Sequence, residues 1–202
     1  MLVVAILLPE NPTEALLAAL PTSDGERVTV MTLQPTEQID VAADAVVWCP
    51  GTPVSSLAAV FEKQSSIKWL HSLSAGVDTI SEFISRRLAA TDVLVTNGRG
   101  AFSSSLAEYA IGACLYFNKE FGRCVRNRTE RKWERFTMDT LAGKTMGFIG
   151  YGDIARATAQ RAAAFGMRLV AMRRQPDKEA SPLLAATYGQ HEWQAFYSQC
   201  AQ

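Results

Sequence analysis

The chain has 202 residues, of which 48% are hydrophobic and 20% are charged, and its 20 basic side chains balance its 20 acidic ones. This composition is globular, it excludes a largely disordered chain, and the length allows one large domain or two small ones. A neutral chain offers no electrostatic reason to expect nucleic acid or an anionic membrane as its main partner. Its longest apolar run, residues 1–8, is much shorter than the roughly 20 residues of a membrane-spanning helix and lacks the flanks of a secretory signal.

The first half of the chain alternates short apolar runs with helical segments. We predict strands over residues 2–8, 27–33, 45–48, 67–71 and 93–96. Helices are predicted over residues 11–20, with Asn11 as the N-cap, 54–64 and 81–90. Because parallel strands need such crossovers, residues 1–97 are predicted to form an open parallel α/β sheet of flavodoxin-like type.

A long helix is predicted next, over residues 103–128. Five side chains recur at steps of three and four residues and give it one apolar face: Leu106, Tyr109, Ala110, Ala113 and Phe117. Residues 119–135 hold seven Lys or Arg and three Glu, which we interpret as a solvated helix end and connector. A nucleic-acid patch is the alternative, although only Phe121 and Trp133 could stack on bases.

The clearest motif begins at residue 145. Residues 145–150 form a short apolar strand that leads through the sequence GYGDIA into a helix ending near Phe165, and a second strand is predicted over 167–172. A glycine turn between a strand and a helix, followed by another strand, is the order of a dinucleotide-binding βαβ unit. The alternative is an ordinary strand-to-helix turn.

Each residue type in this turn has a physical role. Gly150 permits the tight turn, and Gly152 has no Cβ to block the approach of a diphosphate to the backbone. Ala155 replaces the third glycine, because that position mainly requires a small side chain for close helix packing. Free N–H groups at the helix start then attract phosphate. The predicted cofactor-binding residues are Gly150, Tyr151, Gly152, Asp153 and Ile154, together with the two arginines described next.

Two arginines follow the second strand of this unit. An enzyme that binds the ribose 2′-hydroxyl of NAD carries Asp or Glu there, about 20 residues after the glycines. This chain has Arg173 and Arg174 instead, and guanidinium groups can bind a 2′-phosphate. We therefore predict NADP in preference to NAD, with solvated surface arginines as the alternative.

Three segments together resemble the D-isomer-specific 2-hydroxyacid dehydrogenase family: residues 69–78 (WLHSLSAGVD), 95–108 (VTNGRGAFSSSLAE) and 141–174. The resemblance implies a substrate-side domain over residues 1–97, followed by a Rossmann NAD(P)-binding domain over residues 98–202. It also implies that a small 2-oxo or 2-hydroxy acid binds between the two domains. In this family the long helix commonly contributes to a homodimer, which this chain could also form.

The resemblance assigns the substrate carboxylate to the backbone N–H groups of Ser74, Ala75 and Gly76. Exposed amides in a loop after a parallel strand suit an anion, and a plain tight turn is the alternative. Asn97 and Gly100 would shape the crossing between the domains.

The family's acid–base chemistry uses an arginine, a glutamate and a histidine that lie later in the Rossmann domain. Few residues follow Arg174 here, and the only histidine among them, His191, lies in residues 188–197, which we interpret as an amphipathic helix. His71 does not match the family's acid–base histidine, and we interpret it as structural. We therefore predict no catalytic residue in this chain.

A complete Rossmann sheet has roughly six strands, whereas two are predicted from residue 145 onward. We therefore expect a truncated, inactive form of an NAD(P)-dependent 2-hydroxyacid dehydrogenase. A non-catalytic nucleotide-binding or dimerisation module, or a defective product without a stable fold, are the alternatives.

The four cysteines form no CxxC pair, and no histidine lies at metal-ligand spacing from any of them: Cys49, Cys114, Cys124 and Cys200. A chain this long and this rich in core residues does not need a disulfide framework. We therefore expect reduced thiols, no metal site and a cytoplasmic location.

Overall fold

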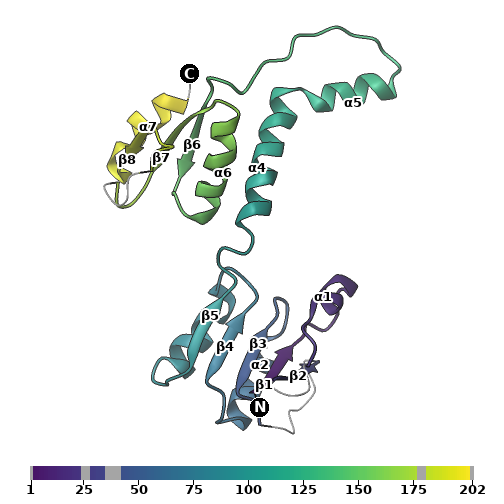
Figure 1. Cartoon of the computed structure of the whole chain (residues 1–202), viewed down its shortest axis with the longest axis vertical. Coiled ribbons are helices and arrows are strands. Elements are labelled where there is room, and N and C mark those ends of the chain that lie inside the picture. Colours follow the sequence, from purple (N-terminus) through teal and green to yellow (C-terminus); the bar gives the residue numbers. More distant parts are fainter. Residues whose placement is uncertain (1, 24–27, 35–41, 177–180, 201–202) are drawn as a thin grey trace. The chain divides into compact units, whose positions relative to one another are not determined.

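The computed structural model describes residues 2–23, 28–34, 42–176 and 181–200. The chain divides into two compact units, residues 1–101 and residues 102–202 (Figure 1). No helix within these described ranges is long and apolar enough to cross a membrane.

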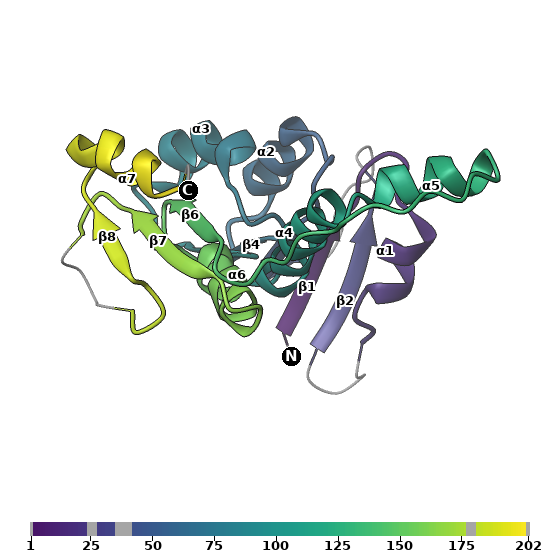
Figure 2. The ribbon, with the colours of Figure 1, turned by 90° about the horizontal axis from the view of Figure 1, so that it is seen from above.

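The first unit is built on a five-stranded parallel sheet. Its strands are β1 (Leu2–Leu7), β2 (Val28–Leu33), β3 (Ala45–Trp48), β4 (Trp69–Ser72) and β5 (Leu94–Asn97). They pair in the order β2-β1-β3-β4-β5, with Val46 opposite Leu70 and Leu70 opposite Val95 (Figure 1). Figure 2 shows β2 beside β1 at one side of this sheet. This order confirms the predicted flavodoxin-like sheet. Residue 27, which was predicted to begin the second strand, lies outside the described residues.

Helices cover both faces of this sheet, as parallel strands require. They are α1 (Glu14–Ala19), α2 (Val54–Lys63) and a segment of mixed turns over residues 78–88, which comprises η1 (Asp78–Ile80), α3 (Ser81–Phe83) and η2 (Ile84–Leu88). The predicted N-cap Asn11 is wrong. The N-cap is Thr13, whose hydroxyl accepts a hydrogen bond from the amide of Leu16 at 3.1 Å. An N-cap side chain bonds an amide two or three residues further on, and α1 begins only at Glu14.

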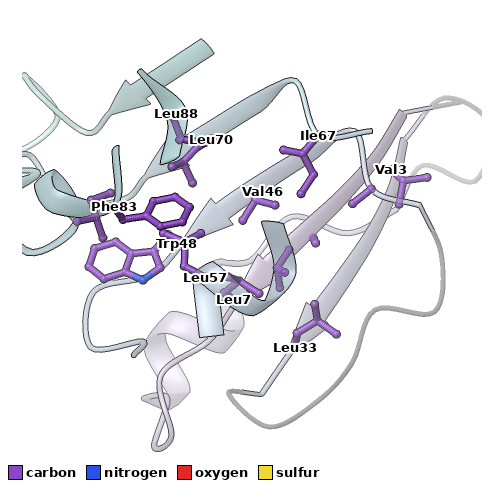
Figure 3. Close-up of a cluster of buried hydrophobic side chains, with 14 residues drawn as sticks. Val3, Leu7, Leu33, Val46, Trp48, Leu57, Ile67, Leu70, Phe83 and Leu88 are labelled. Carbon is purple, nitrogen blue, oxygen red and sulfur yellow. The ribbon is translucent and has the colours of Figure 1, made fainter. Parts of the chain in front are cut away.

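The larger core of this unit lies between the sheet, α2 and the 78–88 segment (Figure 3). Leu57 of α2 and Leu70 of β4 are fully buried in it, and Phe83 packs edge-to-face on Phe61. A smaller cluster on the other sheet face contains Ile6, with α1 packed against it. Burial of a large apolar side chain contributes roughly 1.5–3 kcal/mol, so these clusters hold the strand ends in place.

The second unit contains a three-stranded parallel sheet. Its elements are α4 (Ser103–Asn118), α5 (Phe121–Thr129), β6 (Thr145–Ile149), α6 (Asp153–Ala164), β7 (Arg168–Met172), β8 (Ala186–Tyr188), η3 (Gln190–Glu192) and α7 (Trp193–Cys200). The strand order is β6-β7-β8. The sequence predicted only two of these strands and a helix from residue 188. The third strand was missed because three residues are too few to show a periodicity, and they are defined by their pairing with Val170–Met172.

The two faces of this sheet carry different helices. Phe148, Leu169 and Ala171 face α6, where they form a cluster with Ala159 and Ala162. On the other face α7 approaches so closely that a Cβ on Gly147 would lie 2.8 Å from Cζ of Phe196. Glycine is therefore required at position 147 by the packing of α7 on β6.

The predicted helix over 103–128 is interrupted in the structure. α4 ends at Asn118, and Glu120 adopts a left-handed conformation with φ of 50° before α5 begins. Residues 118–121 contain neither glycine nor proline, so no residue at the break itself predicts it. The predicted apolar face is not the face that α4 buries within this unit, where Ala107 and Ile111 are the buried residues. Tyr109 and Phe117 each remain 77% exposed.

α5 buries none of its residues and is held by charge. The guanidinium of Arg123 donates to the carboxylate of Glu134 at 2.9 Å and to that of Glu120 at 3.0 Å, and it lies 4.1 Å from the ring centroid of Phe136. Asn127 also donates to Glu134, at 3.0 Å. These contacts tie the segment after α5 back onto the helix.

Candidate functional site

The turn after β6 has the geometry that requires glycine. Gly150 has φ of +89°, a region that costs other residues roughly 1–2 kcal/mol. Its amide donates to the carbonyl of Met172 at 2.8 Å, which fixes the turn against the end of β7. A Cβ at position 150 would meet no atom within 4 Å, so the backbone conformation alone makes glycine necessary.

The start of α6 presents unpaired backbone N–H groups. Gly152 is the N-cap and has no side chain with which to cap the helix, and the first amide that bonds back to it is that of Arg156, at 2.9 Å. Within the described part of the chain, the amides of Ile154 and Ala155 have no hydrogen-bond partner. A Cβ at Gly152 would meet nothing within 4 Å, so the approach to these amides is open. The positive end of the helix dipole adds to their attraction for an anion.

Small side chains hold α6 close to the sheet, as the sequence predicted. Ala159 and Ala162 are fully buried, and Ala155 and Ala163 are partly buried in the same cluster. This close packing fixes the helix start beside the carboxyl end of β6. The candidate anion site therefore rests on a closely packed helix start.

The ring of Tyr151 organises the cationic side chains of this site. Tyr151 is only 7% exposed, and its hydroxyl lies 3.1 Å from Oγ of Ser181. The guanidinium carbons of Arg156 and Arg173 lie 6.0 and 5.9 Å from its ring centroid, within the range of a cation–π contact. Arg174, which follows Arg173 in the chain, is exposed. The sequence predicted Arg173 and Arg174 but missed Arg156 and Ser181, because only the fold brings them to the tyrosine.

The loop after β4 is the predicted substrate-carboxylate site. Its first amide is already used, because Ser74 N–H donates to Oγ of Ser72 at 3.2 Å. The side-chain amide of Asn97 donates to the carbonyl of Ala75 at 2.9 Å and fixes the loop. The N–H groups of Ala75 and Gly76 are exposed and have no partner among the described residues. The geometry therefore leaves two of the three predicted amides open to an anion.

Two features near this loop were not foreseen. A Cβ on Gly98 would lie 2.9 Å from the carbonyl oxygen of Leu73, so the chain after β5 passes directly against the loop. A carboxylate oxygen of Asp78 lies 3.0 Å from the position of a Cβ on Gly76. The loop therefore combines open amides with a neighbouring negative charge, whereas the turn at Gly150 combines them with arginines.

His71 lies in β4 of the first unit, and His191 lies in a turn after β8 of the second. Nδ1 of His71 lies 2.8 Å from Oγ1 of Thr96, which also accepts Nε1–H of Trp69 at 2.8 Å. Because the hydroxyl accepts from the tryptophan, it can donate its own hydrogen to Nδ1 of His71. His191 lies exposed in η3, a 3₁₀ turn rather than the predicted helix.

The four cysteines are free thiols, and burial raises the pKa of Cys49. No three His, Cys, Asp or Glu side chains in the described ranges come close enough together to hold a metal ion.

Comparison with known proteins identifies the family. Residues 111–201 match the family model described as D-isomer specific 2-hydroxyacid dehydrogenase, NAD binding domain. This match, the curated relatives and the solved structures all indicate the D-isomer specific 2-hydroxyacid dehydrogenase family. The matched residues include the glycine turn after β6 and the start of α6.

Curated members of this family match parts of the chain. Hydroxypyruvate reductase of Thermotoga maritima is 33% identical over 116 residues, which cover 56% of this chain and 37% of that protein. D-3-phosphoglycerate dehydrogenase of Methanocaldococcus jannaschii is 33% identical over 132 residues, which cover 63% of this chain and 24% of that protein. The chain therefore matches well under half the length of these two dehydrogenases.

Solved structures of the family share the fold. A family member from Aeromonas salmonicida has a TM-score of 0.70 at 21% identity, covering 97% of this chain and 61% of its own. NADPH-dependent glyoxylate/hydroxypyruvate reductase of Sinorhizobium meliloti, in complex with NADP and sulfate, has a TM-score of 0.69 at 20% identity, covering 97% and 59%. These likenesses show that the fold is that of the 2-hydroxyacid dehydrogenases.

Proposed function

We propose that this chain is part of an NADP-dependent oxidoreductase that interconverts a small 2-oxo acid and the corresponding 2-hydroxy acid. The observation that carries the proposal is the start of α6, where Gly150 and Gly152 leave open amides on a rigid helix with arginines beside them. The bound nicotinamide would supply the hydride. Relatives named as hydroxypyruvate reductase and as NADPH-dependent glyoxylate/hydroxypyruvate reductase support this substrate class.

The residues have separate roles in this proposal. The amides from Tyr151 to Ala155 would bind the cofactor diphosphate, and Arg173 and Arg174 would bind the 2′-phosphate that distinguishes NADP from NAD. The amides of Ala75 and Gly76 would bind the substrate carboxylate. Residues 1–97 would then form the substrate-side domain and residues 98–202 would belong to the NADP-binding domain.

We further propose that these 202 residues bind cofactor without turning over substrate. The chain has two histidines, and neither matches the family's acid–base histidine. His71 is engaged with Thr96 inside the first sheet, and His191 is exposed after β8. A proton donor for the substrate carbonyl would have to come from elsewhere.

Cofactor titration tests this function. NADPH fluorescence should change saturably on addition of the chain, and NADH should bind more weakly. An assay with glyoxylate, hydroxypyruvate and pyruvate should then show no turnover. Absence of saturable NADPH binding by the folded chain would refute the cofactor site, whereas turnover of ordinary dehydrogenase size would refute only the proposed inactivity.

The surface of α4 and α5 supports a second role as a dimerisation module. Tyr109 and Phe117 are each 77% exposed, and Val125 is 62% exposed. Large apolar side chains exposed on a surface often mark an interface with another protein. We propose that this surface binds a second copy of the chain. Sedimentation should give a dimer that Phe117→Lys weakens, and a monomer at high concentration would refute the proposal.

The free thiols also support the expected cytoplasmic location, because a reducing compartment keeps cysteines unpaired.

A further inference from the structure

A pocket of about 430 Å³ opens in the first unit, away from the loop after β4. It lies between α2 and the 78–88 segment, over the residues that lead into β4 and β5. Ala75 and Gly76 follow the carboxyl end of β4, whereas the pocket lies at the amino ends of β4 and β5. Its volume falls within the range of small-molecule sites, roughly 300–1,000 Å³.

The inner wall of this pocket is apolar. Phe61 and Phe83 line it with their rings edge-to-face, 5.4 Å between centroids, and Ile67 and Leu88 are 4% and 5% exposed. Figure 3 shows Ile67, Phe83 and Leu88 in the core cluster from which this wall is formed. An apolar side chain of a ligand would find a wall of this kind favourable.

The polar part of the lining contains two charged side chains of opposite sign, Lys68 and Asp92. Within the described residues, the side chains of Lys68 and Asp92 are exposed and form no hydrogen bond or ion pair. The third charged residue, Arg87, is already paired with Glu62 at 2.8 Å, and this pair joins η2 to α2. The pocket therefore offers one available ammonium group and one available carboxylate.

The helix that supplies part of this lining is irregular. The amide of Ala89 donates to the carbonyl of Ile84 at 3.0 Å, which is the five-residue step of a π-helix. Such turns are rare because their packing is less favourable, and they occur frequently at functional sites. Here the π-turn carries Arg87 and Leu88, both of which line the pocket.

We propose that this pocket binds an apolar α-amino acid. The amino acid's side chain would lie on the wall of Phe61 and Phe83, its carboxylate on Lys68 and its ammonium group on Asp92. Charge complementarity favours a zwitterion, because a simple carboxylate would leave Asp92 without a partner and a simple amine would leave Lys68 without one. The proposal is independent of the cofactor site in the second unit.

Ligand comparison tests the charge requirement. L-phenylalanine should bind the 202-residue chain saturably with a stoichiometry of one, as measured by calorimetry. 3-Phenylpropionate and phenethylamine, which each lack one charge, should bind about tenfold more weakly or worse, as expected for loss of one charged hydrogen bond. No saturable L-phenylalanine binding, or equal binding of all three compounds, would overturn the proposal.

Surface variants test the location. Lys68→Met and Asp92→Asn should each weaken L-phenylalanine binding about tenfold. Lys63→Met, an exposed change in the last turn of α2 outside the lining, should leave it unchanged. Unaltered affinity in both pocket variants would overturn the proposal.

A blocking variant provides a second test of the location. Ser65→Trp, at an exposed lining position, should abolish binding, whereas Ser55→Trp, at an exposed position of α2 outside the lining, should not. Thermal melts of all variants verify folding. Undiminished binding by a folded Ser65→Trp chain would place the ligand elsewhere and reject the pocket.

Discussion

The loops after β4 and β6 both leave backbone amides open, but different interactions hold them in place. Each follows a parallel strand and leaves backbone amides open, those of Ala75 and Gly76 in the first unit and those of Ile154 and Ala155 in the second. The first loop is held by a side chain, since Asn97 bonds its carbonyl. The second is held by its own backbone, through the positive φ of Gly150. Open amides therefore do not depend on one method of fixing a loop.

The two loops differ more in the charge around them. Asp78 lies beside Gly76, whereas Arg156 and Arg173 lie over the ring of Tyr151. Two arginines and a helix dipole suit a multiply charged diphosphate, while a loop beside a carboxylate suits at most a singly charged acid. The difference supports the assignment of cofactor to the second unit and small substrate to the first.

The largest expected effect belongs to Gly152→Val. Gly152 has a φ of −90° and open space around its Cβ position, but glycine is preferred to valine at a helix N-cap, so valine should lower the free energy of unfolding by about 1 kcal/mol. The side chain would occupy the approach to the amides, and the loss of charged hydrogen bonds should weaken NADPH binding about 100-fold. Fluorescence titration and urea unfolding measure the two quantities separately.

The matched control is Gly112→Ala on α4, where a Cβ also meets nothing within 4 Å. It should leave NADPH binding unchanged and stabilise the helix by about 0.5–1 kcal/mol. Normal NADPH affinity in Gly152→Val would mean that the diphosphate does not approach this glycine.

A smaller effect is expected for the arginines after β7. The double variant Arg173→Ala/Arg174→Ala should lower the preference for NADPH over NADH about tenfold or more, because guanidinium–phosphate contacts are charge-assisted hydrogen bonds. The ratio of the two dissociation constants is the measurement. Arg168→Ala, an exposed change at the start of the same strand, is the control. A preference for NADPH that survives the double variant would assign the 2′-phosphate to other residues.

Asn97→Ala tests how the first loop is held. It removes the bond to Ala75 and the bond that Arg99 N–H donates to Oδ1 of Asn97 at 3.2 Å. We expect the first unit to lose about 1 kcal/mol of unfolding free energy. NADPH binding should stay the same. A coupled loss of NADPH affinity would show that the two loops are not independent.

The smallest effect is expected at α5, which is held to the segment after it by charged groups and not by an asparagine side chain or a glycine turn. Hydrogen bonds from Arg123 and Asn127 lower the pKa of Glu134 from 4.5 to about 2. Because the pKa is lowered in the folded state, this stabilisation is complete above pH 4.5 and is lost as the pH falls toward 2. The protection factors of the α5 amides, in which the exchange rates are corrected for the intrinsic rate at each pH, should therefore fall over that interval.

Arg123→Gln should move the midpoint of the Glu134 carboxyl signal in a carbon NMR titration back toward 4.5, whereas Arg126→Gln, in the last turn of the same helix, should not. A midpoint near 4.5 in the unaltered chain would contradict the ion pair.

Much of the fold follows from local sequence patterns. The apolar runs predicted the five strands of the first unit, and the glycines at 150 and 152 predicted the turn before α6, because an apolar run and a positive φ each leave a direct mark in the sequence. The break at Glu120 left no such mark, because a left-handed conformation is unusual for a glutamate and the residue type does not predict it.

The remaining errors have a common cause in tertiary packing. Both Ala107 and Tyr109 are compatible with a buried helix face, and the contact of α4 with α6 decides that Ala107 is buried. Likewise, Arg156 is an ordinary helical arginine in the sequence, and only the fold places it beside Tyr151.

The most direct test of the cofactor site is the response of individual amides to NADPH. In a ¹H–¹⁵N spectrum of the chain, the resonances of Ile154 and Ala155 should shift saturably as NADPH is added, with the same dissociation constant as the fluorescence change. NADPH that saturates the protein while these two amides keep their positions would contradict the account.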